Sequence, residues 1–303
     1  MLGEMEGAYA EAVRKAQAQA FDKGDLSWMQ LFTVVQHART EVAAQQMREF
    51  YEKSSAIKFR GVELPESERP TMTAHQTVMQ SMKQIMWLSP YMKDLTFCIF
   101  QNRTPIPFVT SDNPVVNTNR FYCQKIGEDT WGAMSAGALF MLPLGPRLLG
   151  CFFDAGVYSV EKQAYVPVHK KSDVLAFNTM QYLNAAENIY FSDPAVSERI
   201  ATEFEASRER RVKDLARLTE FLAVEMPDGR DRLVRKKSGM DERKFDSKYV
   251  QYCVPRPIPA RWPSVIPFRI NPVAFSNGSA VGYVRHKEWL KSQGRPPGSI
   301  IRP

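Results

Sequence analysis

The sequence predicts an α+β fold with N-terminal helices, a central, mainly antiparallel sheet, a long C-terminal helix and an extended, Pro-rich basic tail. Three observations predict it. Residues 4–22 are rich in strong helix formers, and apolar residues on one helix face follow within 26–51. Short apolar runs separated by turn residues follow between positions 95 and 168. Helical spacing of apolar residues returns at about residue 172. Helices segregated from an antiparallel sheet are typical of the α+β class.

The elements follow in order along the chain. A first helix is expected over 4–22, ended by Gly24, and one or two helices over 26–51. A loop over 60–70 contains Gly and Pro, and the next helix is expected to reach about Leu88 from a Thr cap. The spacing of the later apolar runs favours an antiparallel meander. The expected strands span 95–100, 107–110, 115–116, 138–142, 147–153, 156–160 and 165–168.

Two helices are expected after the strands. The first spans about 172–187. The second begins at Ser192-Asp193-Pro194, where a polar cap precedes a proline suited to the first helical position. Apolar residues at helical spacing extend it to about Met226, which makes it the long helix of the predicted fold.

Charge is distributed unevenly along the chain, whose net charge is +7. Residues 227–303 contain 16 basic and 6 acidic residues and half of the 20 prolines, whereas residues 1–226 carry a net charge of −3. Such a change of composition predicts a boundary. We therefore expect a single α+β domain over 1–226 and a basic, Pro-rich extended tail over 227–303, packed on that domain or trailing from it.

Composition and motifs exclude several classes of protein. With 44% hydrophobic and 24% charged residues, the chain is an ordinary globular protein. It has no Gly-rich nucleotide loop, nucleophile elbow, H-E-x-x-H motif or C-x-x-C pair. His37 and Glu41 alone make a poor metal half-site. The acidic start is followed by no apolar targeting segment, and Arg147 interrupts the apolar stretch 136–153, so we expect a soluble cytoplasmic protein without membrane contact. Because the motifs named above are missing, we also expect neither a metal nor a cofactor.

The segment Phe108–Val116 is the first candidate site, because an apolar strand stops there at Ser111, Asp112 and Asn113. One interpretation is a self-capped turn, in which these short side chains bond nearby amides. The other is a strand end that presents Asp112 and Asn113 at a cleft. Asp112 is then the candidate catalytic residue, although one carboxylate is not a site.

A row of carboxamides is the second feature. Asn178, Gln181 and Asn184 are three residues apart, so neighbours occupy adjoining parts of one helix face. The row is interpreted either as a solvated face or as a surface that binds a ligand or holds the turn around Asp112. The predicted ligand-binding residues are Ser111, Asp112, Asn113, Asn178 and Gln181.

The basic run in 227–303 is the third feature. Its predicted nucleic-acid-binding residues, Arg232, Arg235, Lys236 and Lys237, are followed by aromatic residues. Positive charge with aromatic faces suits single-stranded nucleic acid, although such runs also form solvated linkers.

Residues 108–115, F-V-T-S-D-N-P-V, resemble the F-[IV]-T-S-D-N-P-V signature of DUF4238, a bacterial family of proteins of unknown function. L-P-L-G-P-R at 142–147 and the pair Asn178 and Gln181 support the resemblance, which covers about 30–225. The resemblance implies no particular reaction. It implies that the family's polar positions correspond here to Ser111, Asp112, Asn113, Asn178 and Gln181. The family usually opens with an H-x-V-P-x-x-Y-L-x-x-F segment, and nothing like it precedes Glu4, so the resemblance implies that this chain lacks that element.

The sequence thus favours a binding or interaction module, associated with nucleic acid through the tail. The alternative is a nuclease-like hydrolase that uses Asp112 with Asn113 and Asn178. A protein-interaction or defence component without chemistry of its own is the third hypothesis. Amides orient and recognise ligands but do not transfer protons at neutral pH, so the first hypothesis is preferred and enzymatic activity stays open.

Overall fold

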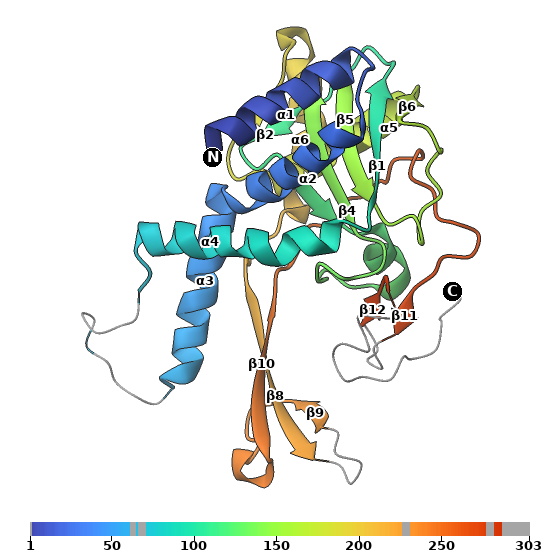
Figure 1. The fold of residues 1–303 in the computed structure, drawn as a ribbon. Helices are drawn as coiled ribbons and strands as arrows, with labels where there is room; N and C mark the ends of the chain where they lie inside the picture. The colour runs from blue at the N-terminus through green and yellow to red at the C-terminus, as the bar shows by residue number, and fades with distance from the viewer. Residues whose placement is uncertain (1, 61–64, 66–70, 226–230, 277–281, 287–303) are drawn as a thin grey trace.

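Figure 1 shows the chain as a computed structural model, which describes residues 2–60, 65, 71–225, 231–276 and 282–286. Side chains are described in the same ranges except at 2, 84–87, 225, 231–233 and 247. Among the helices in these ranges, none has both the length and the apolar character needed to cross a bilayer.

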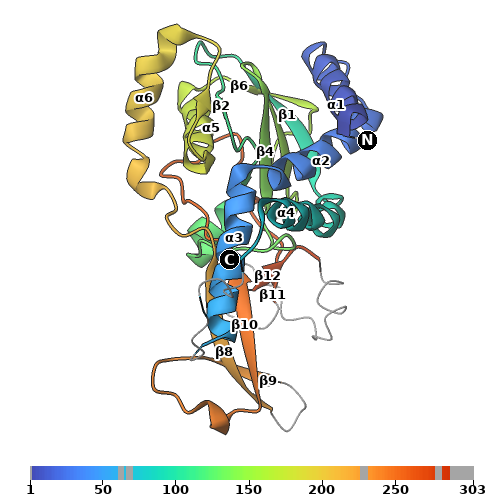
Figure 2. The ribbon, with the colours of Figure 1, turned by 90° about the vertical axis from the view of Figure 1, so that its left-hand side faces the viewer.

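The predicted N-terminal helices are confirmed. They are α1 (Leu2–Gln17), α2 (Lys23–Ala38), α3 (Glu41–Lys58) and α4 (Ala74–Leu88). Asp22 and Asp25 form a capping box at the start of α2, and Thr40 caps α3 by accepting from the amide of Ala43. Thr40 follows α2 by only two residues, so α2 and α3 meet at a sharp corner, from which α3 extends away from the body (Figure 2).

The central sheet has five strands in the order β3-β4-β5-β1-β6. Three of the four pairings are antiparallel, whereas β1 and β6 are parallel, so the sheet is mixed. Antiparallel β4 and β5 are joined by a two-residue turn at Pro146 and Arg147, as expected for a hairpin. The strands are β1 (Thr96–Asn102), β3 (Val116–Thr118), β4 (Leu139–Gly145), β5 (Leu148–Phe153) and β6 (Tyr165–Val168).

Helices cover both faces of this sheet. Alternate residues of a strand point to opposite faces, so Cys151 belongs to one core cluster and Phe152 to the other. The Phe152 face packs against α1 and α2. The Cys151 face packs against α5 (Lys171–Asn184) through Val174, Phe177 and Met180. The α+β class is therefore confirmed, with the core in two layers around one sheet.

The predicted long helix to Met226 is wrong. Helix α6 covers only Ser197–Glu205, and Arg217–Glu225 is a strand, β8. Leu218 and Leu222 are four residues apart, which suits one turn of a helix and also one face of a strand. Tertiary pairing decides the outcome, because β8 lies between two strands and pairs with both.

Strands β8, β9 (Asp231–Arg235) and β10 (Ser247–Cys253) form an antiparallel sheet in the order β10-β8-β9, here named the arm. The arm projects from the body beside α3 (Figures 1 and 2). Phe50 of α3 packs on Tyr252 with ring centroids 4.6 Å apart, and Lys53 donates to the carbonyl of Ala216. The expected boundary near Met226 falls between β8 and β9, outside the described residues, and the arm uses both sides of it.

The Pro-rich segment after β10 runs along the body. Ile266 is buried in the core, and the amide of Ser159 donates to the carbonyl of Pro267. Phe268 stacks on the buried Tyr158 with ring centroids 5.7 Å apart. Short strands β11 (Phe275–Ser276) and β12 (Tyr283–Val284) pair beyond it. Residues 254–276 are thus part of the packed body.

Candidate functional site

Asp112 lies directly after β2 (Thr110–Ser111), which pairs with β7 (Ile189–Tyr190). Its carboxylate accepts hydrogen bonds from the backbone amides of Ala186, Glu187 and Asn188 at 2.8, 2.9 and 2.8 Å. Burial raises the pKa of this carboxyl, but the amide donors outweigh burial and lower it below its ordinary value. Asp112 therefore acts as an anionic cap for the turn that follows α5.

The carboxamide row of α5 lies against the strand end. Asn178 accepts from the amide of Val109 at 3.1 Å and donates to the carbonyl of Pro107 at 2.9 Å. Gln181 accepts from the hydroxyl of Ser111 at 3.0 Å and donates to the carbonyl of Pro114 at 2.7 Å. Both carboxamides are buried, so these bonds satisfy groups that would otherwise be costly to enclose.

The row ends at Asn184, which makes a reciprocal pair with Asn113. Each side-chain amide donates to the other residue's backbone carbonyl, at 2.8 Å from Asn113 and 2.6 Å from Asn184. The structure therefore brings the predicted residues Ser111, Asp112, Asn113, Asn178 and Gln181 together. The hydrogen bonds just described all join the chain to itself, and they fix the turn to α5.

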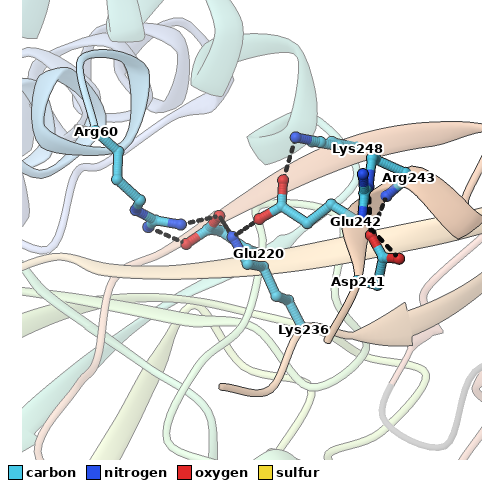
Figure 3. A network of polar contacts seen from close by, with 7 residues as sticks. All are labelled: Arg60, Glu220, Lys236, Asp241, Glu242, Arg243 and Lys248. Carbon is cyan, nitrogen blue, oxygen red and sulfur yellow. Dashed lines mark hydrogen bonds and ion pairs between the residues drawn. The ribbon is translucent and has the colours of Figure 1, made fainter. Parts of the chain in front are cut away.

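The predicted nucleic-acid-binding residues lie elsewhere, in and after β9 of the arm (Figure 1). Figure 3 shows Lys236 between two carboxylates, those of Glu220, at 3.1 Å, and Glu242. Arg235 and Lys237 are exposed, whereas the side chain of Arg232 lies outside the described residues. The charge of Lys236 is thus engaged within the arm.

A cavity of about 260 Å³, named here the inner cavity, opens beside the Asn113–Asn184 pair. The corner between α2 and α3 provides His37 and Thr40, and the end of α5 provides Asn184 to Ala186. The segments 211–215 and 255–257 complete its wall. An adjoining cavity of about 350 Å³ shares Lys213 and Arg256 with it and is named the outer cavity.

Arg256 is the most unusual residue of this wall. The residue is partly exposed, but its Nε is enclosed without a hydrogen-bond acceptor, and no carboxylate lines the inner cavity beside it. Burial lowers the pKa of Arg256 to about 10, so the side chain is still a cation at neutral pH. Its carbon Cζ lies 5.7 Å from the ring centroid of Trp131, and its amide donates to the carbonyl of Asp129. A buried charge normally has a partner.

His37 is the second unsatisfied group. Its Nδ1 is enclosed without a hydrogen-bond partner, and the ring meets Phe140 edge-on at 6.3 Å. The pKa of His37 is lowered to about 3, mainly by burial and also by the charge of Arg256, while a hydrogen bond with the backbone of Val115 acts in the opposite direction. The imidazole is therefore neutral at neutral pH.

The inner cavity is electropositive. Arg211, Lys213 and Arg256 line it, and its described lining contains no carboxylate. Arg211 donates to the carbonyls of Ala185 and Ala186 and lies 5.4 Å from the ring of Tyr182. In the described part of the chain, no three His, Cys, Asp or Glu side chains gather as they would around a metal ion. The chemistry available is hydrogen-bond and charge recognition of an anion.

Sequence reasoning missed Arg256 and treated His37 only as a partner of Glu41. The carboxylate of Glu41 instead pairs with Arg48. The available signal was the tripeptide Pro255-Arg256-Pro257, because flanking prolines hold an Arg in a defined backbone position. Nothing in the local sequence shows that it meets His37.

Comparison with known proteins identifies a family for this chain. The model of a family described as protein of unknown function (DUF4238) matches residues 1–195. No curated protein and no solved structure matches the chain. The matched range contains the turn at Asp112, the α5 row and His37, whereas Arg256 and the arm lie beyond it. That the family's opening segment is missing stays a prediction.

Proposed function

Because the chain belongs to the DUF4238 family of proteins of unknown function, we propose a function from its own geometry: it is a binding module that holds a small anionic ligand in the inner cavity. The observation that carries this proposal is that Arg256 lines this cavity with no carboxylate in the cavity's lining, and that its enclosed Nε has no hydrogen-bond acceptor.

An unpaired charge in a protein wall lowers stability, because water solvates it better than the protein does. Arg256 faces this cost without a carboxylate, while Arg211 and Lys213 add positive charge to the same cavity. An anion would remove the cost by accepting from the guanidinium, whose planar fork suits carboxylate and phosphate oxygens. The free energy of desolvation that destabilises the free protein would therefore be offset when an anion binds.

The hydrogen-bonded turn around Asp112 forms part of the cavity wall. Asn113, Asn184 and Ala186 belong both to the hydrogen-bonded turn and to the cavity lining. A wall fixed by side-chain bonds to the backbone loses little conformational freedom on binding, which favours affinity. In this proposal the predicted residues Ser111, Asp112, Asn178 and Gln181 position the site, and Asn113 also lines it.

Isothermal titration of the full chain with inorganic phosphate tests the proposal. We expect a dissociation constant in roughly the millimolar range, since a small anion has few atoms to contribute. Arg256→Gln is expected to weaken binding about tenfold or more, because one charge-assisted pair contributes roughly 1.5–3 kcal/mol. Arg261→Gln, at a nearby exposed arginine, is the matched control and should bind as the unchanged protein does. Equal affinity of all three proteins would reject the proposal.

Stability gives an independent readout. Without phosphate, Arg256→Gln is expected to unfold at the same or a higher urea concentration, because it removes an uncompensated charge. With excess phosphate, only the chains that retain Arg256 should gain stability. A variant that simply misfolds would lose stability under both conditions.

We also propose nucleic acid as a partner of residues 227–303. The supporting observation is that Tyr249, Phe221 and Arg235 are directly paired across the three strands of the arm, so their side chains share one face. A steep loss of oligonucleotide affinity with salt, reduced in Arg235→Gln/Lys237→Gln, is the expected result. The hydrolase alternative has less support, since the Asp112 carboxylate is occupied by backbone amides.

A cytoplasmic location forms part of the proposal. All four cysteines are free, and Cys98 and Cys151 are buried opposite each other in β1 and β5. Unpaired thiols are typical of a reducing compartment.

A further inference from the structure

We infer that the inner and outer cavities form one site for a small organic molecule with two anionic groups, one in each cavity. The inference rests on the proposed function and names the chemical class of its ligand. Segments 212–213 and 255–257 line both cavities, whose volumes are about 260 and 350 Å³. Together the cavities lie within the roughly 300–1,000 Å³ of small-molecule sites, whereas an inorganic anion alone would leave most of this space to water.

The outer cavity is the more exposed of the two. In the described lining of the inner cavity, only Lys213 is exposed. The outer lining has further exposed residues, namely Arg210, Asp214, Arg217 and Ile258. A ligand that fills both cavities therefore has one end enclosed by the body and the other end near solvent.

The carboxylates of the outer cavity each have a cation beside them. Asp129 forms a bidentate pair with Arg217, at 2.8 and 2.9 Å. Asp214 lies 4.0 Å from Nζ of Lys53. These two carboxylates therefore leave the other cations of the outer cavity unneutralised.

Two of those cations have no partner. Within the part of the chain that the structure describes, the side chains of Arg210 and Lys213 make no hydrogen bond and no ion pair. Each cavity has a cation of its own, Arg211 in the inner and Arg210 in the outer, and both cavities share Lys213 and Arg256. Because guanidinium and ammonium groups bond most strongly to anionic oxygens, this distribution favours an anionic group in each cavity.

The residues common to both cavities also indicate what joins the two anionic groups. Val212, Pro255 and Pro257 belong to both linings. Their side chains are apolar, and a proline has no backbone N–H to donate. A short hydrocarbon chain or ring that lies against these residues would gain from burial of apolar surface. The expected ligand is therefore a compact dicarboxylate or bisphosphate.

Linear dicarboxylates from succinate to suberate test the inference on the unchanged protein. Near pH ~8 all of them are dianions, so the total charge stays constant while the separation of the two carboxylates grows. Two fixed anion positions should select one chain length, because affinity is highest when a linker matches the span between two sites. Isothermal titration at constant ionic strength should show that the preferred member binds about tenfold or more tightly than succinate, the gain from one added charge-assisted contact.

Arg210→Gln removes the cation that lines only the outer cavity. It is expected to lower the affinity for the preferred dicarboxylate about tenfold and to abolish the length preference, while phosphate binding falls much less. Arg208→Gln, at an exposed arginine that lines neither cavity, is the matched control and should keep the full preference. Both side chains are exposed, so both variants are expected to fold.

The outcomes separate the two proposals. If phosphate binding depends on Arg256 but dicarboxylate affinity is constant or rises steadily with chain length, the present inference is overturned and the anion-binding function stands. Failure to bind phosphate and every dicarboxylate would overturn both. A length preference that persists in Arg210→Gln would overturn the outer cavity as the position of the second anionic group.

Discussion

Asn113 and Asn184 hold each other by two hydrogen bonds, in which each side chain donates to the other's backbone. One residue belongs to a turn after a strand and the other to the last position of α5. The pair therefore closes the carboxamide row at the edge of the inner cavity, where a loss of order would affect both the fold and the site.

Replacing Asn184 should test how much the row contributes to stability. Asn184→Ala removes donors to the carbonyls of Asn113 and Val115 and is expected to lower the free energy of unfolding by about 1–3 kcal/mol. Urea unfolding followed by circular dichroism measures it. Gln80→Ala, at an exposed carboxamide of α4, is the control and should change stability by no more than about 0.5 kcal/mol.

Asp112 should make stability depend on pH in a defined direction. Its pKa is lower in the folded chain than in the unfolded one, so its stabilisation is complete above the unfolded value of about 4. That stabilisation is lost as the pH falls through the folded pKa, where the carboxylate becomes protonated. Asp112→Ala should therefore be less stable than the unchanged protein by about 1–3 kcal/mol at neutral pH, with the difference narrowing in acid.

The matched control is Glu187→Ala, at an exposed carboxylate next to the same turn. Its difference from the unchanged protein should be small at every pH. A difference at Asp112 that stays constant down to acid pH would contradict the anionic cap.

Three glycines should respond to alanine in a graded series. A Cβ added at Gly132 would have no atom within 4 Å, so Gly132→Ala should barely change the melting temperature. Gly127 also has space but has φ +81°, so Gly127→Ala should cost about 1–2 kcal/mol. Gly137 has φ +76°, and a Cβ there would lie 2.6 Å from Cβ of Phe121. Gly137→Ala should therefore be the most destabilising by thermal unfolding, and equal melting temperatures would contradict this.

Arg285 should be essential for attaching the last described segment to the body. It makes a bidentate pair with Asp94 at 2.8 and 3.1 Å and donates to the carbonyls of Tyr91, Ala133 and Ser135. Arg285→Met leaves these buried acceptors unsatisfied and is expected to cost about 3–5 kcal/mol. Arg285→Lys should restore little, because an ammonium cannot reproduce the planar fork. Arg261→Met is the exposed control, and urea midpoints compare them.

The ion pair between Arg60 and Glu220 should contribute much less, although it joins the turn after α3 to the arm (Figure 3). Arg60 is largely exposed, so a double-mutant cycle with alanine at both positions should give a coupling of about 0.2–1 kcal/mol that falls with salt. A large coupling that does not change with salt would mean that the pair is more enclosed than its exposure indicates.

Local sequence patterns predicted the supports of the site. The three-residue spacing of Asn178, Gln181 and Asn184 placed them on one helix face, and the strand end at Ser111 to Asn113 was visible from its polar residues and Pro114. Their meeting was one of two interpretations of the carboxamide row, the other being a solvated helix face, and the hydrogen bonds of Asn178, Gln181 and Asn184 to the turn support the former. These are local properties that spacing and residue type express directly.

The cavity could not be predicted in the same way. His37 follows the pattern of a helix, and Arg256 lies in a Pro-rich segment far along the chain, so only the tertiary fold shows that they share a wall. The strand β8 was missed for a related reason: Leu218 and Leu222 fit two periodicities, and pairing with β9 and β10 decided between them. The parallel pairing of β6 with β1 depends equally on distant contacts.

The inner cavity is built from the base of the arm. Residues 211–215 lead into β8, and residues 255–257 follow β10, so the two segments that line the inner cavity also connect the arm to the body. A partner that moves the arm would therefore move both of these cavity segments together. In return, a ligand that contacts both segments would restrict the movement of the arm relative to the body.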